Sequence, residues 1–147
     1  MEKTEGYKIL NDLLRAFNQD TDTVLELFNS ESTIEYPYAK EMGLPYQLTK
    51  DDYRKHLDNM LGQMPDILFT GIKVDALQEA DWYWGEFQGE TTVPHSGAVY
   101  KQNYVVNFKL QNGKFSFYKE YWNVLPVLQS LMAKEEAHRI IDNSVKS

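Results

Sequence analysis

Three residues of this 147-residue sequence have side chains suited to moving a proton: Glu120, His56 and Tyr104. Glu120 lies in the most apolar stretch of the chain, between Tyr118 and Trp122. If this stretch is a strand, alternation places Tyr118, Glu120 and Trp122 on one face. A carboxylate between two aromatic residues is costly to bury without a partner, so Glu120 either has a structural partner or takes part in chemistry. In the second case desolvation raises its pKa, which suits the group to take up and return a proton near neutral pH.

His56 and Tyr104 are the candidates to assist this carboxyl group. His56 shares a helical stripe with Tyr53 and Met60, which predicts that it points inward, and imidazole titrates near neutral pH. A buried His that only hydrogen-bonds a neighbour is the structural alternative. The phenol of Tyr104 could donate a hydrogen bond to a developing oxyanion, or the ring could simply fill space.

Aromatic residues make up 14% of the chain, with 10 Tyr, 7 Phe and 3 Trp. Tyr and Trp combine an apolar body with a polar tip, a composition suited to a cavity wall or an interface. We expect the following residues to bind a substrate: Tyr36, Tyr38, Tyr53, Met60, Trp84, Tyr118 and Trp122. A packed core would use the same residue types, and the sequence alone leaves both interpretations open.

Composition and motifs exclude several classes of function. The net charge of −7 and the lack of any Lys/Arg cluster argue against nucleic acid as a partner. The absence of cysteine fits a reducing compartment and removes thiol chemistry, and three scattered histidines give no metal signal. No phosphate-binding loop or dinucleotide motif is present, so no cofactor is expected. A polar N-terminus and short apolar runs predict a cytoplasmic protein without membrane contact.

Helices are expected first and strands afterwards. Helical patterns cover 7–17, 20–29 and 49–64, the third starting at Thr49 and ended by Pro65. A short strand is expected at 33–36 and a loop at 40–47, followed by four long strands at 67–79, 80–93, 98–110 and 114–122. A last helix follows Asn123, and 133–147 either extends it or frays. This order predicts one domain over 1–147, with a core at about 5–132, of α+β class with helices packed on a curved antiparallel sheet.

Three segments carry a resemblance to a known fold. They are Glu35-Tyr-Pro-Tyr-Ala39, Tyr100-Lys-Gln-Asn-Tyr104 and, above all, 113–128, which reads Gly-Lys-Phe-Ser-Phe-Tyr-Lys-Glu-Tyr-Trp-Asn-Val-Leu-Pro-Val-Leu. Together with the element order they resemble the nuclear transport factor 2-like fold, also called SnoaL-like or ketosteroid-isomerase-like. The last segment is similar to the ending of SnoaL-like proteins and of the phenazine-biosynthesis PhzA/PhzB family. The resemblance covers roughly 5–132 and implies a cone-shaped sheet with a pocket.

The resemblance also implies a site. The phenazine family has a His on its third helix and a Glu on its last strand as acid/base groups, and these fall on His56 and Glu120. The Ser that lines the pocket of that family falls on Met60 here. Because of this departure, the resemblance does not imply the family's own substrate. The function implied is cofactor-free acid/base chemistry (isomerisation, cyclisation, dehydration or condensation) on a small hydrophobic cyclic or carbonyl compound. The alternatives are a non-catalytic binding protein for an apolar metabolite or partner, and a purely structural dimer with a collapsed core.

A homodimer is also expected. Proteins of this resemblance commonly pair through the outer face of the sheet. On the last strand Phe115, Phe117 and Tyr121 should form an outer face too apolar to be left in water.

Overall fold

A curved six-stranded sheet forms the centre of the computed structural model, which describes residues 4–146. The strand order is β2-β1-β6-β5-β4-β3. The strands are β1 (Phe28–Glu35), β2 (Gln47–Thr49), β3 (Leu68–Ala76), β4 (Trp82–Thr92), β5 (Val99–Gln111) and β6 (Lys114–Trp122). Neighbouring strands are antiparallel except β1 and β6, which run parallel. The predicted α+β class is confirmed, with a sheet that is antiparallel in all but this one pair.

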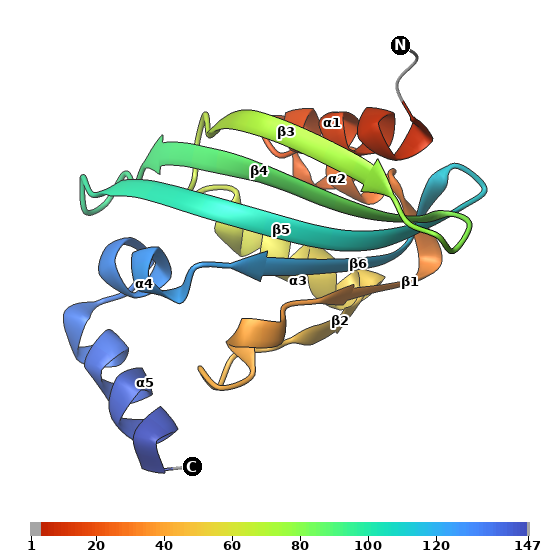
Figure 1. The fold of residues 1–147 in the computed structure, drawn as a ribbon. Coiled ribbons are helices and arrows are strands. Elements are labelled where there is room, and N and C mark those ends of the chain that lie inside the picture. Colours follow the sequence, from red (N-terminus) through yellow and green to blue (C-terminus); the bar gives the residue numbers. More distant parts are fainter. Residues whose placement is uncertain (1–3, 147) are drawn as a thin grey trace.

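Three helices cover the concave face of the sheet: α1 (Glu5–Ala16), α2 (Thr21–Leu25) and α3 (Lys50–Met60) (Figure 1). The main core lies between them and the strands. Its completely buried members include Leu10, Leu13, Val24, Phe28, Ile34, Tyr53, Phe108, Phe115 and Tyr118. Burial of these large side chains, at about 1.5–3 kcal/mol each, drives the helices onto this one face.

A capping box begins α3. The Thr49 hydroxyl accepts a hydrogen bond from the Asp52 backbone N–H at 3.1 Å, and the Asp52 carboxylate accepts one from the Thr49 N–H at 3.2 Å. Both bonds satisfy backbone donors that the first turn would otherwise leave free. The start of α3 is therefore fixed, which fixes the side of the helix on which Tyr53 and His56 face the sheet.

A two-residue turn sets the register of the last hairpin. Asn112 and Gly113 both have positive φ, of 55° and 76°, as a type I′ turn requires. In the resulting pairing Tyr104 lies opposite Trp122. Val106 lies opposite Glu120, so Tyr104 and Glu120 are diagonal neighbours on the concave face.

The expected orientation of Phe115 is wrong. A register shift between Lys109 and Leu110 pairs Leu110 with Phe115 and Lys109 with Phe117, leaving Ser116 as an extra residue in β6. Such a bulge reverses the alternation of side chains on its far side. Phe115 consequently points into the core with no exposed surface, and only Phe117 and Tyr121 lie on the outer face.

Two further segments differ from the sequence expectation. The second helix ends at Leu25, because Phe28 enters the sheet beside Phe115 and packs against it with ring centroids 4.8 Å apart. Strand β2 lies at the end of the expected loop, where it pairs with β1. In both places contacts with distant strands decide the local structure.

The chain after β6 forms three short pieces: α4 (Val124–Pro126), the π-helical turn η2 (Val127–Leu131) and α5 (Lys134–Lys146). The single helix expected after Asn123 is interrupted at Met132, which has extended backbone. Val127 packs with Met42, Val93 and Tyr100 in a second, smaller core. No helix within residues 4–146 has the length and apolar character needed to cross a bilayer.

Candidate active site

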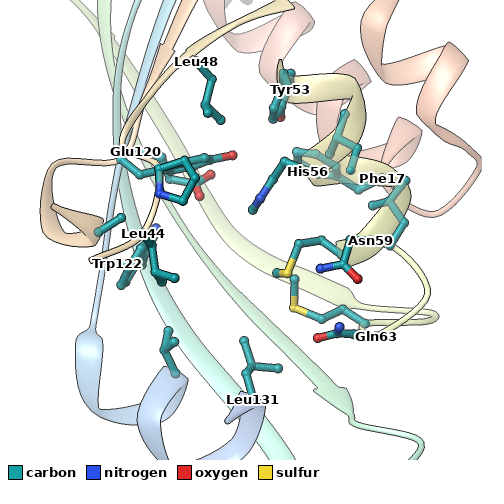
Figure 2. Close-up of a pocket in the computed structure, with 18 of the residues that line it drawn as sticks. Phe17, Leu44, Leu48, Tyr53, His56, Asn59, Gln63, Glu120, Trp122 and Leu131 are labelled. Carbon is teal, nitrogen blue, oxygen red and sulfur yellow. The ribbon is translucent and has the colours of Figure 1, made fainter. Parts of the chain in front are cut away.

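A cavity of about 730 Å³ lies between α3, the concave face of the sheet and the segment that follows β6 (Figure 2). This volume is within the range of about 300–1,000 Å³ typical of small-molecule sites. Its wall includes Tyr36, Tyr53, His56, Met60, Tyr104, Glu120 and Trp122. The structure thus brings all three candidate catalytic residues into one space.

Glu120 projects from β6 into this cavity, deep inside the protein. Glu120 is half-buried: the surface it retains faces the cavity, and protein packs around the rest of the side chain. Tyr118, two residues earlier on the same face, donates its hydroxyl proton to Oε1 of Glu120 at 2.9 Å. Burial raises the pKa of Glu120 to about 7, although the hydrogen bond from Tyr118 opposes the rise. Near neutral pH the group therefore exists in both protonation states.

Further tyrosine hydroxyls lie around this carboxyl group. Burial raises the pKa of Tyr36, Tyr53 and Tyr104, and proximity to Glu120 raises each of them further. All three phenols are therefore protonated at neutral pH and available as hydrogen-bond donors. The hydroxyl of Tyr53 is completely buried and, within the part of the chain that the structure describes, completes no hydrogen bond of normal geometry, even with the nearby Tyr36.

His56 reaches the cavity from α3, on the wall opposite Glu120 (Figure 2). Its ring packs on Tyr36 and Tyr53, with centroids 5.2 and 6.3 Å away. Burial lowers its pKa, so the imidazole is neutral at pH 7. Among residues 4–146 nothing forms a hydrogen bond with the imidazole, which leaves both ring nitrogens available to a ligand.

Three of the predicted binding residues lie outside the cavity wall. Trp84 is 40% exposed on the outer face of the sheet, because it alternates with Tyr83 and Gly85 on β4. Tyr38 is 47% exposed in the turn η1 (Pro37–Ala39) and packs against Tyr121. Tyr118 is fully buried behind Glu120 and acts on the site only through its hydrogen bond.

Several residues of the site were not singled out from the sequence. Val127, Leu131 and Met132, from the segment after β6, form part of the wall. Gln102 and Tyr100 lie on β5 with Tyr104, and hydrogen bonds link the three side chains. Their spacing of two residues places them on one strand face, a signal that the sequence did contain.

Known proteins are similar to this chain over most of its length. The family model described as a SnoaL-like domain matches residues 10–118, about three quarters of the chain. The match ends two residues before Glu120, so it does not depend on the candidate carboxyl group. An uncharacterised PhzA/B-like protein of Pseudomonas aeruginosa is 27% identical over 130 residues, covering 86% of this chain and 89% of that protein.

Two solved structures share the fold. A candidate isomerase from Bacillus subtilis superimposes with a TM-score of 0.75 at 25% identity, covering 88% of this chain and 96% of the other. A phenazine biosynthesis-related protein from Pseudomonas aeruginosa gives a TM-score of 0.67 at 22% identity, with 85% and 86% of the two chains covered. Both solved structures therefore share the fold of this chain.

Proposed function

The chain belongs to the SnoaL-like family, and on that premise we propose that it is a cofactor-free enzyme that moves protons on a small hydrophobic cyclic or carbonyl compound. One observation carries the proposal: Glu120 is a carboxyl group with a pKa raised by burial to about 7, and it faces a cavity of ligand size. A group that titrates near the working pH can both take and return a proton. The relatives described as a candidate isomerase and as a phenazine biosynthesis-related protein support small-molecule chemistry.

In the proposed reaction the Glu120 carboxylate takes a proton from a carbon atom next to the substrate's carbonyl group. The electron pair of the broken C–H bond moves to the carbonyl oxygen, which becomes an enolate. The hydroxyl of Tyr104 donates a hydrogen bond to that oxygen, because donors aimed at a developing negative charge stabilise it. The protonated Glu120 then returns the proton, to the same carbon or to another one.

The neutral His56 faces the same substrate from the opposite wall. The neutral ring has one N–H group, which can donate a hydrogen bond to the substrate, and one bare nitrogen, which can accept a hydrogen bond from it; neither contact introduces a charge. Tyr36, Tyr53, Met60 and Trp122 surround the substrate and exclude water. In this proposal Glu120 transfers the proton, and His56 assists it by hydrogen-bonding the substrate.

Proton exchange tests the proposal without knowledge of the natural substrate. A panel of cyclic ketones and enones is incubated with the protein in D2O, and uptake of deuterium next to the carbonyl group is followed by NMR. The wild type should accelerate exchange for some member, with a rate that rises through about pH 7 as Glu120 loses its proton. Glu120→Gln should lose about 10²–10⁴-fold of the acceleration while keeping its fold. Equal exchange by wild type and variant would sink the assignment.

The alternative function, a non-catalytic binding protein, uses the same cavity. Its supporting observation is the predominantly apolar wall contributed by residues such as Phe69, Phe87, Leu131 and Met132. A binding protein should retain apolar ligands tightly, bind them equally well after Glu120→Gln, and catalyse no exchange. The two functions therefore differ in the effect of one substitution.

We also propose that two copies pair through the outer face of the sheet. Five aromatic side chains gather there, with contacting rings whose centroids are 5.5–6.3 Å apart. Trp82 contacts Phe117, and Tyr121 contacts both Tyr38 and Trp84. Lys109 and Lys119 lie over the rings of Trp82 and Tyr121, 5.8 and 5.7 Å from their centres. Aromatic residues gathered on one exposed face are typical of protein interfaces.

A further inference from the structure

The end of the cavity next to α1 is lined by hydrocarbon side chains. They are Phe17, Ile67, Phe69 and Phe87. Figure 2 shows Phe17 on the side of the cavity away from Glu120. The ring centroids of Phe17 and Phe69 are 6.1 Å apart, those of Phe69 and Phe87 5.6 Å, and those of Phe87 and Tyr104 4.8 Å. Contacting aromatic rings therefore extend from the end of α1 to Tyr104, and this end of the cavity is suited to an apolar group.

Ile67 is fixed at this end through its backbone. The side-chain amide of Asn18 donates to the carbonyl oxygen of Ile67 at 2.9 Å, and its oxygen accepts a hydrogen bond from the N–H of Ile67 at 3.0 Å. Both polar backbone groups of Ile67 are thus paired within the protein. A polar ligand group placed among these side chains would lose its hydrogen bonds with water without gaining others from them. The end therefore favours the hydrocarbon part of a ligand.

Gly89 lies behind this end, on the inner face of β4, where it pairs with Phe69 of β3. A Cβ atom at position 89 would lie 3.0 Å from Cδ1 of Ile67, 3.2 Å from Cε2 of Tyr104 and 3.3 Å from Cε1 of Phe69. These separations are shorter than the roughly 3.5–4.0 Å at which carbon atoms pack. All three side chains line the cavity. The lack of a side chain at Gly89 therefore lets them lie back against the sheet.

A larger residue at position 89 would push these side chains forward. Tyr104 already stacks on Phe87, and Asn18 holds the backbone of Ile67, so neither can yield by moving along the sheet. Because protein interiors are close-packed, displaced atoms move into the nearest empty space, which here is the cavity. The room available at the apolar end thus depends on one missing Cβ atom.

The cavity has space for more than one ring. Its volume of about 730 Å³ corresponds to roughly 24 water molecules at about 30 Å³ each. A single-ring ketone with its carbonyl group beside Glu120 would leave the apolar end without contacts. Side chains that face such a gap lose their dispersion attraction on that side, so a longer molecule should bind better.

We propose that Gly89 determines the length of ligand that the cavity accepts, and that the end formed by Phe17, Ile67, Phe69 and Phe87 is a subsite for a hydrocarbon ring. The inference deepens the proposed function and rests on it for the placement of the ligand's carbonyl group at Glu120. It adds a ligand class: a flat ketone whose far end is a hydrocarbon ring without polar substituents. Gly89 is a positioning residue, because it acts through side chains that line the cavity.

Two ketones of different length test the proposal. Cyclohexanone has one ring, and 1-tetralone carries a second, hydrocarbon ring fused to the first. NMR titration gives both dissociation constants, and the wild type should bind 1-tetralone about tenfold or more tightly than cyclohexanone. Gly89→Ala should weaken the binding of 1-tetralone about five- to tenfold and that of cyclohexanone by less than about twofold. Gly89→Val, with a larger side chain, should weaken 1-tetralone further.

Gly85→Ala is the matched control on the same face of β4. A Cβ atom there would lie 2.9 Å from Leu10 and 3.1 Å from Val106, two core residues outside the cavity wall. This variant should lose stability and keep the wild-type ratio of the two affinities.

A rescue variant tests whether the effect is steric. Ile67→Val removes Cδ1, the atom nearest to a Cβ at position 89. Added to Gly89→Ala, it should bring the affinity for 1-tetralone back to within about threefold of the wild-type value. Phe17→Trp fills the same end from α1 in a chain that keeps Gly89, so it should also weaken 1-tetralone alone. This second route keeps the test decisive if the Gly89 variants do not fold.

The possible outcomes separate the subsite from the chemistry. An unchanged affinity ratio in Phe17→Trp and in folded Gly89→Ala would overturn the proposal, and so would equal weakening of both ketones or a changed ratio in Gly85→Ala. If the ratio changes as expected while no ketone exchanges its α-protons in D2O, the subsite stands and the enzymatic proposal fails. If α-protons exchange while the ratio is the same in every variant, the subsite is wrong and the proposed function stands.

Discussion

Tyr118 and Glu120 project from the same face of β6, and the Tyr118 hydroxyl donates to Oε1 of the carboxyl group at 2.9 Å. One carboxyl oxygen is thus held by the protein while the other is left for the cavity. The bond favours the charged form of Glu120 and opposes the effect of burial.

Removal of this donor should make Glu120 harder to ionise. In Tyr118→Phe the carboxylate loses a hydrogen bond of the kind worth about 1.5–3 kcal/mol to a charged group, so its pKa should rise by about one pH unit or more above 7. Titration of 13C-labelled carboxyl groups by NMR, assigned with Glu120→Gln, measures this directly. The midpoint of deuterium exchange should move with it. A fall in the pKa would show that the hydroxyl stabilises the protonated form instead.

Stability should depend on pH through the same group. The pKa of Glu120 rises from 4.5 to about 7 on folding, so the folded state binds the proton more tightly and stability falls as pH increases through this window. The pKa difference corresponds to a loss of roughly 3 kcal/mol in the free energy of unfolding, and solvent screening in the cavity reduces this loss to about 2 kcal/mol. Urea unfolding of wild type and Glu120→Gln at pH 5 and pH 8 isolates this contribution, because other groups cancel. The variant should lose less stability between the two pH values, and identical losses would contradict the burial of Glu120.

His56 should titrate below 6.5, since burial lowers its pKa and no carboxylate binds it. The Cε1–H signal, assigned with His56→Gln, gives the value by NMR. The stability that comes from its neutral form is present above pH 6.5 and declines as pH falls toward the lowered pKa. A pKa above 6.5 would mean that the imidazolium pairs with ionised Glu120 across the cavity.

The bulge in β6 separates two phenylalanines that the plain strand pattern places together. Phe115→Ala should cost about 3–5 kcal/mol, because Phe115 is completely buried between Phe28 and Phe108. Phe117→Ala should cost about 1 kcal/mol in a monomer, since it removes only a surface contact with Trp82. Chemical denaturation of both variants compares these costs. Similar values would mean that the two rings share a face.

A charge on the outer face should break the proposed dimer. Tyr121→Glu places a carboxylate beside Tyr38 and Trp84 on the outer face, where a second copy would otherwise exclude water. Light scattering after gel filtration should give twice the chain mass for wild type and the single mass for the variant. His95→Glu, in the turn after β4, serves as a charge control. A monomeric wild type would refute this interface.

The sequence predicted the elements that local pattern determines. The start of the third helix at Thr49 and the bounds of β6 each follow from a few neighbouring residues. β2 and the bulge at Ser116 could not be predicted this way, because pairing with distant strands creates them.

The same distinction applies to the site. Strand alternation and helical spacing were enough to place Glu120 and His56 on cavity walls, while their roles remain predictions. Trp84 lies on the outer face because β4 alternates, and its inner face carries Tyr83, Gly85, Phe87 and Gly89. The small glycines on the inside leave room for α1 and for the ring of Tyr104. The orientation of the Gln102 amide could not be predicted from the sequence, because it depends on hydrogen bonds with the backbone of Asn123, which lies after β6.

The parallel pairing of β1 with β6 has a consequence for how the protein is made. During synthesis β1 emerges early and has only β2 beside it until β6 leaves the ribosome. Closing so long a loop is slow, and meanwhile the edges of β1 and β5 stay open to other chains. Tyr36 and His56 are synthesised before β3, β4 and β5, and Glu120 only after them. A nascent chain therefore has no complete cavity until β6 has been synthesised. The site should therefore appear abruptly and late, and chaperones that shield strand edges should raise the yield of active protein.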